Sequence, residues 1–295
     1  MPELPEVQTT IDRLIAAGLI GERIVSAEVG WPRTVGGDWR AFEAAIRGLV
    51  ICTLTRRGKY LLFELQRAER ADADGRTRPT DGAGVLWAIC HLRMSGRLHL
   101  LDGAAPREGH ERLVLLLESG RELRFVDPRK FGRFVMHRDP ASVLDVLGPE
   151  PLADGFTGEV LAAALEGRRR ALKPLLLDQT VIAGLGNIYV DEALFVAHLH
   201  PLRPAGSLSA EEVVALHAAI RRVLRTGIAN LGASLGYGRT NFRLPDGGSG
   251  HNREALQVFR RTGRPCPDCG APIQRIMVAQ RSTHICPHCQ PAGQE

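Results

Sequence analysis

The stretch CPDCGAPIQRIMVAQRSTHICPHC (residues 266–289) decides the architecture of the C-terminal part of the chain. It holds two Cys-x-x-Cys pairs separated by sixteen residues, with the cysteines at positions Cys266, Cys269, Cys286 and Cys289. Thiolates bind zinc tetrahedrally and each pair supplies two ligands, so the spacing predicts one four-cysteine zinc site. Because four thiolates fill the coordination shell and leave no position for an activated water, we predict a structural Zn2+ ion.

The residues between the two pairs have the pattern of a β-hairpin over 273–284 that presents Arg275 and Arg281. Arginines on such a hairpin suit contact with a DNA backbone or groove. His284 and His288 are expected beside the zinc site or in solvent rather than as ligands.

The segment upstream of this zinc finger has helical periodicity. Ser209 and Glu212 predict a capping box, and the helix that follows has one apolar face formed by Val213, Leu216, Ile220 and Leu224. Residues 230–253 are rich in Gly, Asn and Arg and are interpreted as a long loop.

The N-terminal half has a different pattern. Residues 3–17 show helical spacing, with Pro2 placed where a helix begins. From Ile24 to about His137 the sequence is rich in strands without intervening helices, which favours an antiparallel sandwich. The polar stretch 66–84 is interpreted as an insertion without chemistry. We therefore expect an α+β protein: an N-terminal helix and antiparallel β-sandwich (1–148), a helical domain (149–253) and a β-hairpin zinc finger (254–295).

Composition narrows the functional classes. The 295 residues carry a net charge of +5, which is compatible with a polyanionic partner. No apolar run approaches the length of a membrane span, and the acidic start MPELPEV does not resemble a secretory signal, so we expect no membrane partner and a cytoplasmic location. Only 5% of the residues are aromatic, which argues against a stacking platform for single strands.

The N-terminus offers a reactive group if Met1 is removed. An α-amino group has an ordinary pKa near ~8, so much of a Pro2 amine is unprotonated at neutral pH. Such an amine can attack a sugar carbon and form a Schiff base, with Glu3 as proton carrier. From these residues alone, however, the ordinary helix-start interpretation of Pro-Glu is favoured.

Several segments together carry a specific resemblance. They are MPELPEV (1–7), RRGKYLLFEL (56–65), HLRMSGRL (91–98), DPRKFGR (127–133), GLGNIYVDEALF (184–195) and the four-cysteine finger, in that order. Together they closely resemble the bacterial formamidopyrimidine-DNA glycosylases, a family shared with endonuclease VIII. The similarity spans nearly the whole chain.

The resemblance implies the following catalytic residues. Pro2 matches the family's nucleophile and Glu3 its acidic partner. Lys59 matches a lysine that acts on the opened sugar and its phosphate, and Arg281 matches an arginine that contacts the phosphate beside the lesion and assists strand cleavage.

It also implies residues that bind DNA. Met94, Arg129 and Phe131 match the side chains that fill the gap left by a flipped nucleotide. From sequence alone, core packing would account for Met94 and Phe131, and a surface ion pair for Arg129. Asn187 matches a phosphate-binding residue of a helix–two-turns–helix element, although an N-cap role is an alternative. The remaining matches to DNA-contacting positions are His91, His110, Arg168 and Lys173.

The chain departs from the family at three places. The stretch 66–84 lengthens a connection that the family usually keeps short. Gln8 stands where Glu is common, and we expect it to be harmless on an exposed helical face. Residues 232–248, which match the loop covering the flipped base, diverge most from the family pattern.

The resemblance thus implies a base-excision repair enzyme that acts on double-stranded DNA, and a monomer is the default expectation. Its reaction would remove oxidised purines through a Pro2 Schiff base and cut the strand by β,δ-elimination. The alternatives are an endonuclease VIII-like enzyme for oxidised pyrimidines and a non-catalytic zinc-finger DNA-binding protein.

Overall fold

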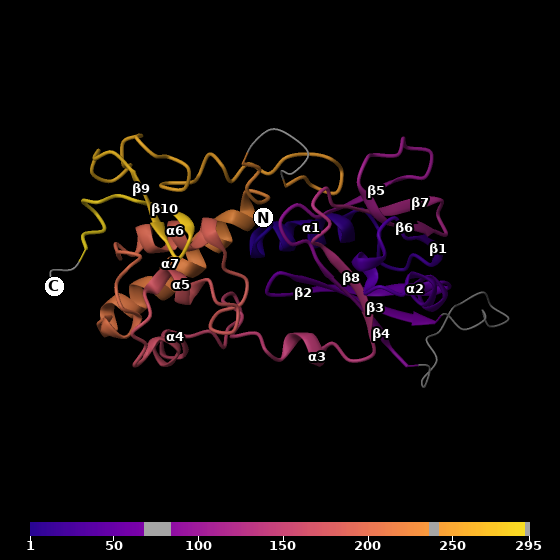
Figure 1. The fold of residues 1–295 in the computed structure, drawn as a ribbon, viewed down its shortest axis with the longest axis horizontal. Coiled ribbons are helices and arrows are strands. Elements are labelled where there is room, and N and C mark those ends of the chain that lie inside the picture. The colour runs from indigo at the N-terminus through magenta and orange to yellow at the C-terminus, as the bar shows by residue number, and fades with distance from the viewer. Residues whose placement is uncertain (68–83, 236–241, 293–295) are drawn as a thin grey trace. The chain divides into compact units, whose positions relative to one another are not determined.

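The computed structural model describes residues 1–67, 84–235 and 242–292 (Figure 1). The chain forms two compact units, one made of Met1–Asp145 with Leu231–Gly250 and the other of Val146–Asn230 with His251–Glu295. The predicted α+β class is confirmed, with a β-sandwich in the first unit and helices plus a β-hairpin in the second. Most of the predicted 66–84 insertion and the centre of the 232–248 loop lie outside the described residues.

Helix α1 (Leu4–Ala16) opens the first unit and buries Val7, Ile11 and Leu14 on one face. The predicted start of this helix at residue 3 was one residue too early. Glu3, in an extended conformation, is the N-cap, and Pro5 is the proline of the first turn. Pro2 therefore precedes the helix, and no helical hydrogen bond constrains its nitrogen.

Two four-stranded antiparallel sheets follow. One has the order β2-β3-β4-β8, with bounds Leu49–Arg57, Tyr60–Arg67, Leu86–His91 and Arg133–His137. The other has the order β1-β6-β7-β5, with bounds Ile24–Glu28, Glu111–Leu117, Arg121–Val126 and Arg97–Asp102. Phe63 and Phe134 of the first sheet and Leu115 and Phe125 of the second belong to one buried cluster. This shared core confirms the predicted sandwich.

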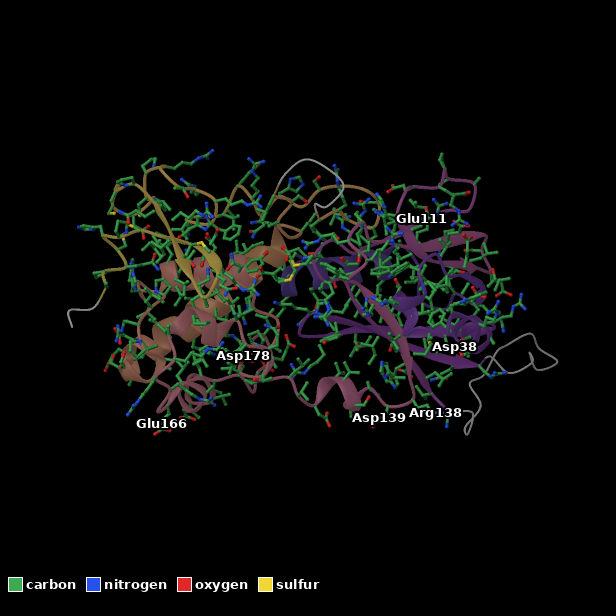
Figure 2. The ribbon with its side chains drawn as sticks, viewed as in Figure 1. Asp38, Glu111, Arg138, Asp139, Glu166 and Asp178 are labelled. Atoms are coloured by element: carbon green, nitrogen blue, oxygen red, sulfur yellow. The ribbon has the colours of Figure 1, made fainter. Side chains whose placement is uncertain are left out.

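The strand-rich interpretation missed the helical elements between β1 and β2. They are η1 (Pro32–Val35) and α2 (Trp39–Ile46), and a short helix α3 (Ala141–Leu144) follows β8. The carboxylate of Asp38, a residue labelled in Figure 2, accepts the Ala41 N–H at 3.0 Å and caps α2. Phe42 and Ile46, four residues apart, then bury one face of this helix against the sandwich core.

The second unit contains α4 (Gly158–Leu165), α5 (Leu172–Leu176), α6 (Asn187–Val196), η2 (Ala205–Ser207) and α7 (Ala210–Ala229). The predicted capping box at α7 is confirmed, because Ser209 N–H donates to Glu212 at 2.9 Å and Glu212 N–H donates to Ser209 Oγ at 3.3 Å. The predicted apolar face of α7 is buried as well.

The chain ends in the hairpin β9 (Gln274–Val278) and β10 (Arg281–Ile285), as predicted. Its core joins Phe195 of α6 to Val258, Ile273, Cys266 and Cys286. Within the described part of the chain, no helix combines the length and apolar character that crossing a membrane requires.

Candidate active site and DNA-binding surface

The segment Pro2–Glu3 lies directly before α1. Glu3 and Glu6 form a capping box, in which Glu3 N–H donates to Glu6 Oε2 at 2.8 Å. Pro2 is buried and the Glu3 side chain is almost completely so. The capping box holds the backbone of Glu3, so the position of the preceding proline is set as well.

Lys59 lies in the tight turn between β2 and β3, where Gly58 has a positive φ of 56°. The turn is braced by Arg56, whose guanidinium donates to the Gly58 carbonyl at 3.0 Å and to Gln8 Oε1 at 2.9 Å. Gln8 is therefore half-buried and ties α1 to the turn that carries Lys59. The expected exposed position of Gln8 is therefore corrected, while the harmless exchange of Glu for Gln there stays a prediction.

His91 ends β4 and packs edge-on against Tyr60, with ring centroids 4.6 Å apart. Its Nδ1 accepts the Arg93 N–H at 2.9 Å, which places the ring proton on Nε2. Burial, aided by the positive charges of Arg93 and Lys59, lowers the pKa of His91 to about 3. His91 is therefore neutral at physiological pH and offers a neutral N–H donor rather than a cation.

A residue that the sequence interpretation did not single out, Asp127, organises two neighbouring loops. Its buried carboxylate accepts Ser95 Oγ–H at 2.5 Å, the Arg129 N–H at 3.1 Å and the Gly132 N–H at 2.7 Å. A Cβ at Gly132 would lie 2.3 Å from the Phe125 ring, so only glycine fits there. The first residue of DPRKFGR could have suggested this role, because Asp commonly accepts N–H groups two residues on.

The two loops present large apolar groups to solvent. Met94 is 38% exposed and Phe131 is 49% exposed, so core packing does not account for either. The Arg129 guanidinium lies over the Phe131 ring, 4.9 Å from its centroid. Exposed side chains of this kind are available to enter a gap in a base stack. His110 is also exposed, with a positive φ of 78° and its Nδ1 3.1 Å from the Arg112 guanidinium.

In the second unit, Asn187 is the first residue of α6 and Gly186 is the N-cap. The alternative N-cap role for Asn187 is therefore wrong. Its Nδ2 donates instead to the Ser282 carbonyl at 3.0 Å and links α6 to the finger hairpin. Arg168 is exposed beyond the end of α4, within reach of a polyanion.

Lys173 is completely buried on α5, which argues against direct contact of its ammonium with DNA, and the predicted contact stays untested. Its ammonium donates to Asp191 at 2.6 Å, to Thr283 Oγ1 at 2.8 Å and to the Ser282 carbonyl at 3.1 Å. All three hydrogens of the ammonium are therefore used inside the protein. The sequence pattern of a basic run could not separate this buried lysine from its exposed arginine neighbours.

Two consecutive acids of α6 attach this helix to the finger. Asp191 also accepts the His284 N–H at 2.9 Å, and its Oδ2 lies 3.2 Å from His284 Nδ1. Glu192 accepts the backbone N–H groups of residues 257–259, although burial raises the pKa of this carboxyl. Arg281, the first residue of β10, is exposed, and its carbonyl accepts Thr283 Oγ1–H at 3.1 Å. Asp191 thus anchors the strand that presents Arg281, and Glu192 anchors the segment that leads into the finger.

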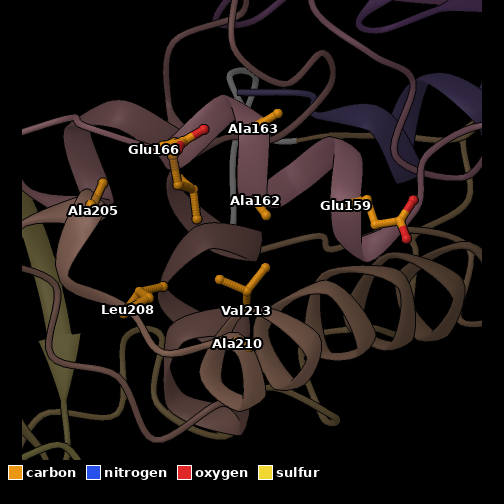
Figure 3. Close-up of a pocket in the computed structure, with 10 residues that line it drawn as sticks. Glu159, Ala162, Ala163, Glu166, Ala205, Leu208, Ala210 and Val213 are labelled. Atoms are coloured by element: carbon orange, nitrogen blue, oxygen red, sulfur yellow. The ribbon is translucent and has the colours of Figure 1, made fainter.

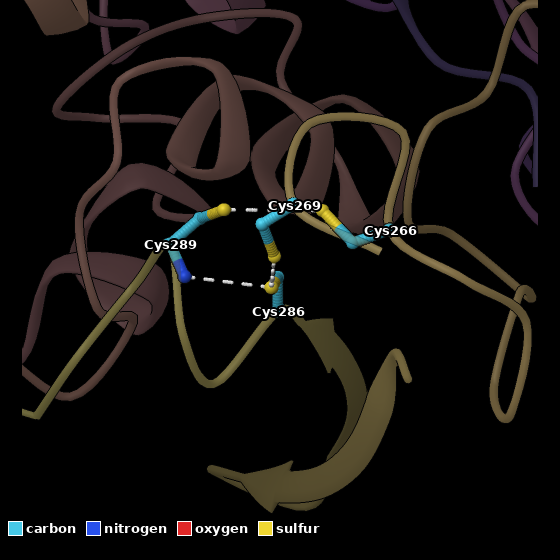
Figure 4. Close-up of side chains that lie close together, drawn as sticks. All are labelled: Cys266, Cys269, Cys286 and Cys289. Carbon is cyan, nitrogen blue, oxygen red and sulfur yellow. Dashed lines mark hydrogen bonds between the residues drawn. The ribbon is translucent and has the colours of Figure 1, made fainter. Parts of the chain in front are cut away.

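The four finger cysteines converge on one point (Figure 4). Their sulfur atoms all lie within 4.8 Å of one another, and the Cys289 N–H approaches Cys286 Sγ at 3.4 Å. This donor set fits a tetrahedral zinc site, as predicted. His284 packs against Asp191 and His288 is exposed, so neither belongs to the cluster, also as expected.

A separate groove on the second unit lies between α4 and the start of α7, lined by residues such as Ala162, Leu208 and Val213 (Figure 3). Its lining is apolar apart from Glu159 and Glu166, and it contains neither a histidine nor a cysteine. It is therefore not a candidate catalytic centre.

Comparison with known families covers most of the chain. Residues 1–134 match the formamidopyrimidine-DNA glycosylase N-terminal domain, residues 147–237 the formamidopyrimidine-DNA glycosylase H2TH domain, and residues 263–292 the zinc finger found in FPG and IleRS.

Individual proteins agree. The formamidopyrimidine-DNA glycosylase of Protochlamydia amoebophila is 43% identical over 98% of this chain and 99% of its own length. That of Herpetosiphon aurantiacus is 45% identical over 98% of this chain and 100% of its own length. A solved complex of a Lactococcus lactis Fpg variant with Fapy-dG-containing DNA matches with a TM-score of 0.86 at 34% identity, covering 99% of this chain and all of that one. A second Lactococcus lactis complex contains DNA with an oxidised pyrimidine. It matches with a TM-score of 0.85 at 35% identity, with the same coverage.

Proposed function

Because the chain belongs to the formamidopyrimidine-DNA glycosylase family, we propose that it excises oxidised purines, such as 8-oxoguanine and formamidopyrimidines, from double-stranded DNA. The relatives bear the name of this activity, and the Lactococcus protein was solved with Fapy-dG in its DNA. One observation in this chain carries the proposal: Pro2 lies outside α1, directly before the buried N-cap residue Glu3.

In the proposed reaction, removal of Met1 exposes the secondary amine of Pro2. The amine nitrogen attacks C1′ of the damaged nucleotide, the bond from C1′ to the base breaks, and the departing base takes up a proton. The sugar ring then opens to give a Schiff base between Pro2 and C1′. Loss of a C2′ proton breaks the C3′–O bond (β-elimination), and a second elimination breaks the C5′–O bond. Covalent catalysis of this kind divides one hard step into easier ones.

Three further side chains would support these steps. Glu3, adjacent to the nucleophile and screened from bulk water, would carry protons. Lys59, in the turn braced by Arg56, would act on the opened sugar and its phosphate. Arg281, exposed at the start of β10, would neutralise the phosphate that leaves.

The DNA-binding surface would include residues of both units. Met94, Arg129 and Phe131 would fill the gap in the stack, since exposed apolar and planar groups recover part of the unstacking cost. His91 would donate from Nε2, with His110, Arg168 and Asn187 as further contacts to the DNA. Lys173 is left out of this set.

We also propose that the cysteine cluster holds one structural Zn2+ ion. Bound there, the ion would fix the fold of the finger hairpin, while the reaction itself uses only side chains and the N-terminus. The domain limits 1–148, 149–253 and 254–295 belong to the same proposal, with Leu231–Gly250 packing in the compact unit of the first domain. A cytoplasmic location and a monomeric state remain predictions.

The substrate class is tested by competition. Two duplexes are mixed at equal concentration, one with 8-oxoguanine opposite cytosine and the other with 5-hydroxycytosine opposite guanine. Cleavage of each duplex is followed with a separate label. We expect the purine lesion to be cut first. Preferential cleavage of 5-hydroxycytosine would instead support the pyrimidine-specific alternative, for which the oxidised-pyrimidine complex of the Lactococcus protein is the relevant observation. A mature chain that keeps Met1 and binds DNA without cleaving it would favour the non-catalytic alternative.

A further inference from the structure

The carboxylate of Glu6 joins two segments of the first unit that are far apart in the sequence. Glu6 Oε2 accepts the Glu3 N–H at 2.8 Å, and Glu6 Oε1 accepts the Ala233 N–H at 2.8 Å. The side chain is almost completely buried. Each oxygen thus serves a different backbone segment, one beside the candidate nucleophile and one in the segment that follows α7.

The close approach of the second segment depends on Gly232. This residue has a positive φ of 77°, and a Cβ built there would lie 2.9 Å from Glu6 Cγ and 3.1 Å from Glu6 Oε1. A side chain at position 232 would therefore be strained and would also press on the carboxylate. Glycine at this position is what allows Ala233 N–H to reach Glu6.

The Ala233 segment is itself held in place by described residues on either side of 236–241. Ser234 Oγ donates to the Phe242 carbonyl at 2.9 Å and accepts the Gly250 N–H at 2.9 Å. On the far side, the Pro245 carbonyl accepts the Leu100 N–H at 3.3 Å and lies 3.3 Å from His99 Nδ1. The Ala233 N–H is therefore presented to Glu6 by a fixed backbone rather than by a free strand end.

The hydrogen bond at the other oxygen bears directly on Pro2. The Glu3 N–H belongs to the planar peptide group that also contains the Cα of Pro2. Fixing the direction of that N–H therefore fixes the plane from which the proline ring extends. Since Pro2 precedes the helix, Glu6 replaces the hydrogen bonds that a helix would otherwise supply.

We propose that Glu6 is a positioning residue that couples the Gly232–Ala233 backbone to the Pro2–Glu3 peptide. The proposal rests on the proposed function, in which Pro2 is the nucleophile. Displacement of Gly232–Ala233 moves the Glu6 carboxylate and so misplaces the Pro2 amine. The coupling needs both carboxylate oxygens as acceptors, which a glutamine side chain cannot provide.

The test compares Gly232→Ala with Gly120→Ala. Gly120 lies in the same unit, in the turn between β6 and β7, and has a similar φ of 82°, but a Cβ there meets nothing within 4 Å. The control therefore carries the same backbone strain without touching Glu6. A third variant, Glu6→Gln, keeps the size of the side chain and removes one acceptor.

The first readout needs no DNA. Hydrogen exchange at the Glu3 amide should be faster by about tenfold in Gly232→Ala, which corresponds to about 1.4 kcal/mol, and nearly unchanged in Gly120→Ala. Equal exchange at Glu3 in the two glycine variants overturns the proposal. This result does not depend on whether the protein is a glycosylase, so failure of the coupling and failure of the proposed function are distinguishable.

The second readout is the single-turnover rate of base release from an 8-oxoguanine:cytosine duplex, measured together with duplex affinity. Glu6→Gln and Gly232→Ala should each slow base release by about tenfold or more at nearly unchanged affinity, and the double variant should be no slower than the slower single variant. Losses that multiply in the double variant, or a Gly120→Ala variant as slow as Gly232→Ala, overturn the proposal. If Gly232→Ala does not fold, Glu6→Gln alone decides: unchanged exchange at Glu3 and unchanged base release reject the coupling.

Discussion

Gln8 Oε1 accepts a hydrogen bond from Arg56 Nε at 2.9 Å, and this contact connects the helix that begins after Pro2 to the turn that carries Lys59. The same arginine also donates to the Gly58 carbonyl one residue before Lys59. Two candidate catalytic groups from separate elements are thereby attached to one another through a glutamine and an arginine.

Replacing Gln8 with alanine should loosen this connection. Loss of a half-buried hydrogen bond costs about 1 kcal/mol, and we expect a several-fold lower rate of strand cleavage at a preformed abasic site. Gln8→Glu is the matched control, because it keeps the acceptor for Arg56. The new carboxylate would lie near that of Asp12, and repulsion between these like charges destabilises the helix by only about a few tenths of a kcal/mol. Equal losses in both variants, measured by thermal unfolding and cleavage rate, would contradict the account.

Lys173 and Arg168 should behave differently even though both lie in one basic run. Lys173→Met leaves Asp191 buried without its ammonium partner, so the free energy of unfolding should fall by about 3–5 kcal/mol. Arg168→Ala should leave stability nearly unchanged and weaken DNA binding. The plot of log binding constant against log salt concentration should become shallower by about one unit, which corresponds to one lost phosphate contact. Chemical denaturation and binding titrations over a range of salt concentrations measure both effects. A lysine variant with normal stability and a shallower salt slope would show that Lys173 reaches DNA after all.

The neutral state of His91 predicts a defined pH dependence of stability. Its folded pKa of about 3 lies below the ordinary value of 6.5, so the unfolded chain binds a proton first as the pH falls. The stabilisation is complete above about pH 6.5 and is lost progressively towards pH 3, at up to about 1.4 kcal/mol per pH unit for this one proton.

A His91→Gln variant should therefore lose stability less steeply than the parent chain between pH 6.5 and 4.5. The comparison with the parent is needed because burial also lowers the pKa values of His99, His137 and His200. Parallel stability curves for the parent and the variant would show that His91 already titrates near its ordinary value.

The zinc site can be tested with a matched pair of cysteine variants. Cys286 belongs both to the four-cysteine cluster and to the small core of the finger, whereas Cys52 is half-buried in the other unit. Cys286→Ser should lose most of the bound metal and with it DNA affinity, because metal binding stabilises the fold that it creates. Cys52→Ser should retain about one Zn2+ per chain. Elemental analysis of the purified proteins decides, and full zinc content in Cys286→Ser would exclude this ligand set.

The sequence predicted those features that depend on local spacing. The clustering of the two Cys-x-x-Cys pairs, the Ser209 capping box and the strand-rich composition of the sandwich each follow from a short-range rule, and the structure confirms them. Helix α2 was missed because its eight residues form an apolar face only at Phe42 and Ile46, within a region otherwise dominated by strands.

The features that were not predicted depend on partners distant in the sequence. Lys173 is buried because Asp191 and Thr283, 18 and 110 residues away, neutralise and bind its ammonium. Gln8 is engaged because Arg56 of another element reaches it. The Asp127 bonds to Ser95 and the joining of Glu3 to Ala233 through Glu6 are likewise tertiary, so no periodicity could reveal them.

The central claim is that the Pro2 amine is the nucleophile, and borohydride trapping tests it most directly. The protein is incubated with an 8-oxoguanine:cytosine duplex and borohydride, which reduces a Schiff base to a stable amine, and the cross-linked peptide is mapped by mass spectrometry. The account predicts a covalent adduct on the nitrogen of Pro2 in a chain that has lost Met1. An adduct on Lys59 or another lysine, or base release without any adduct, would contradict it.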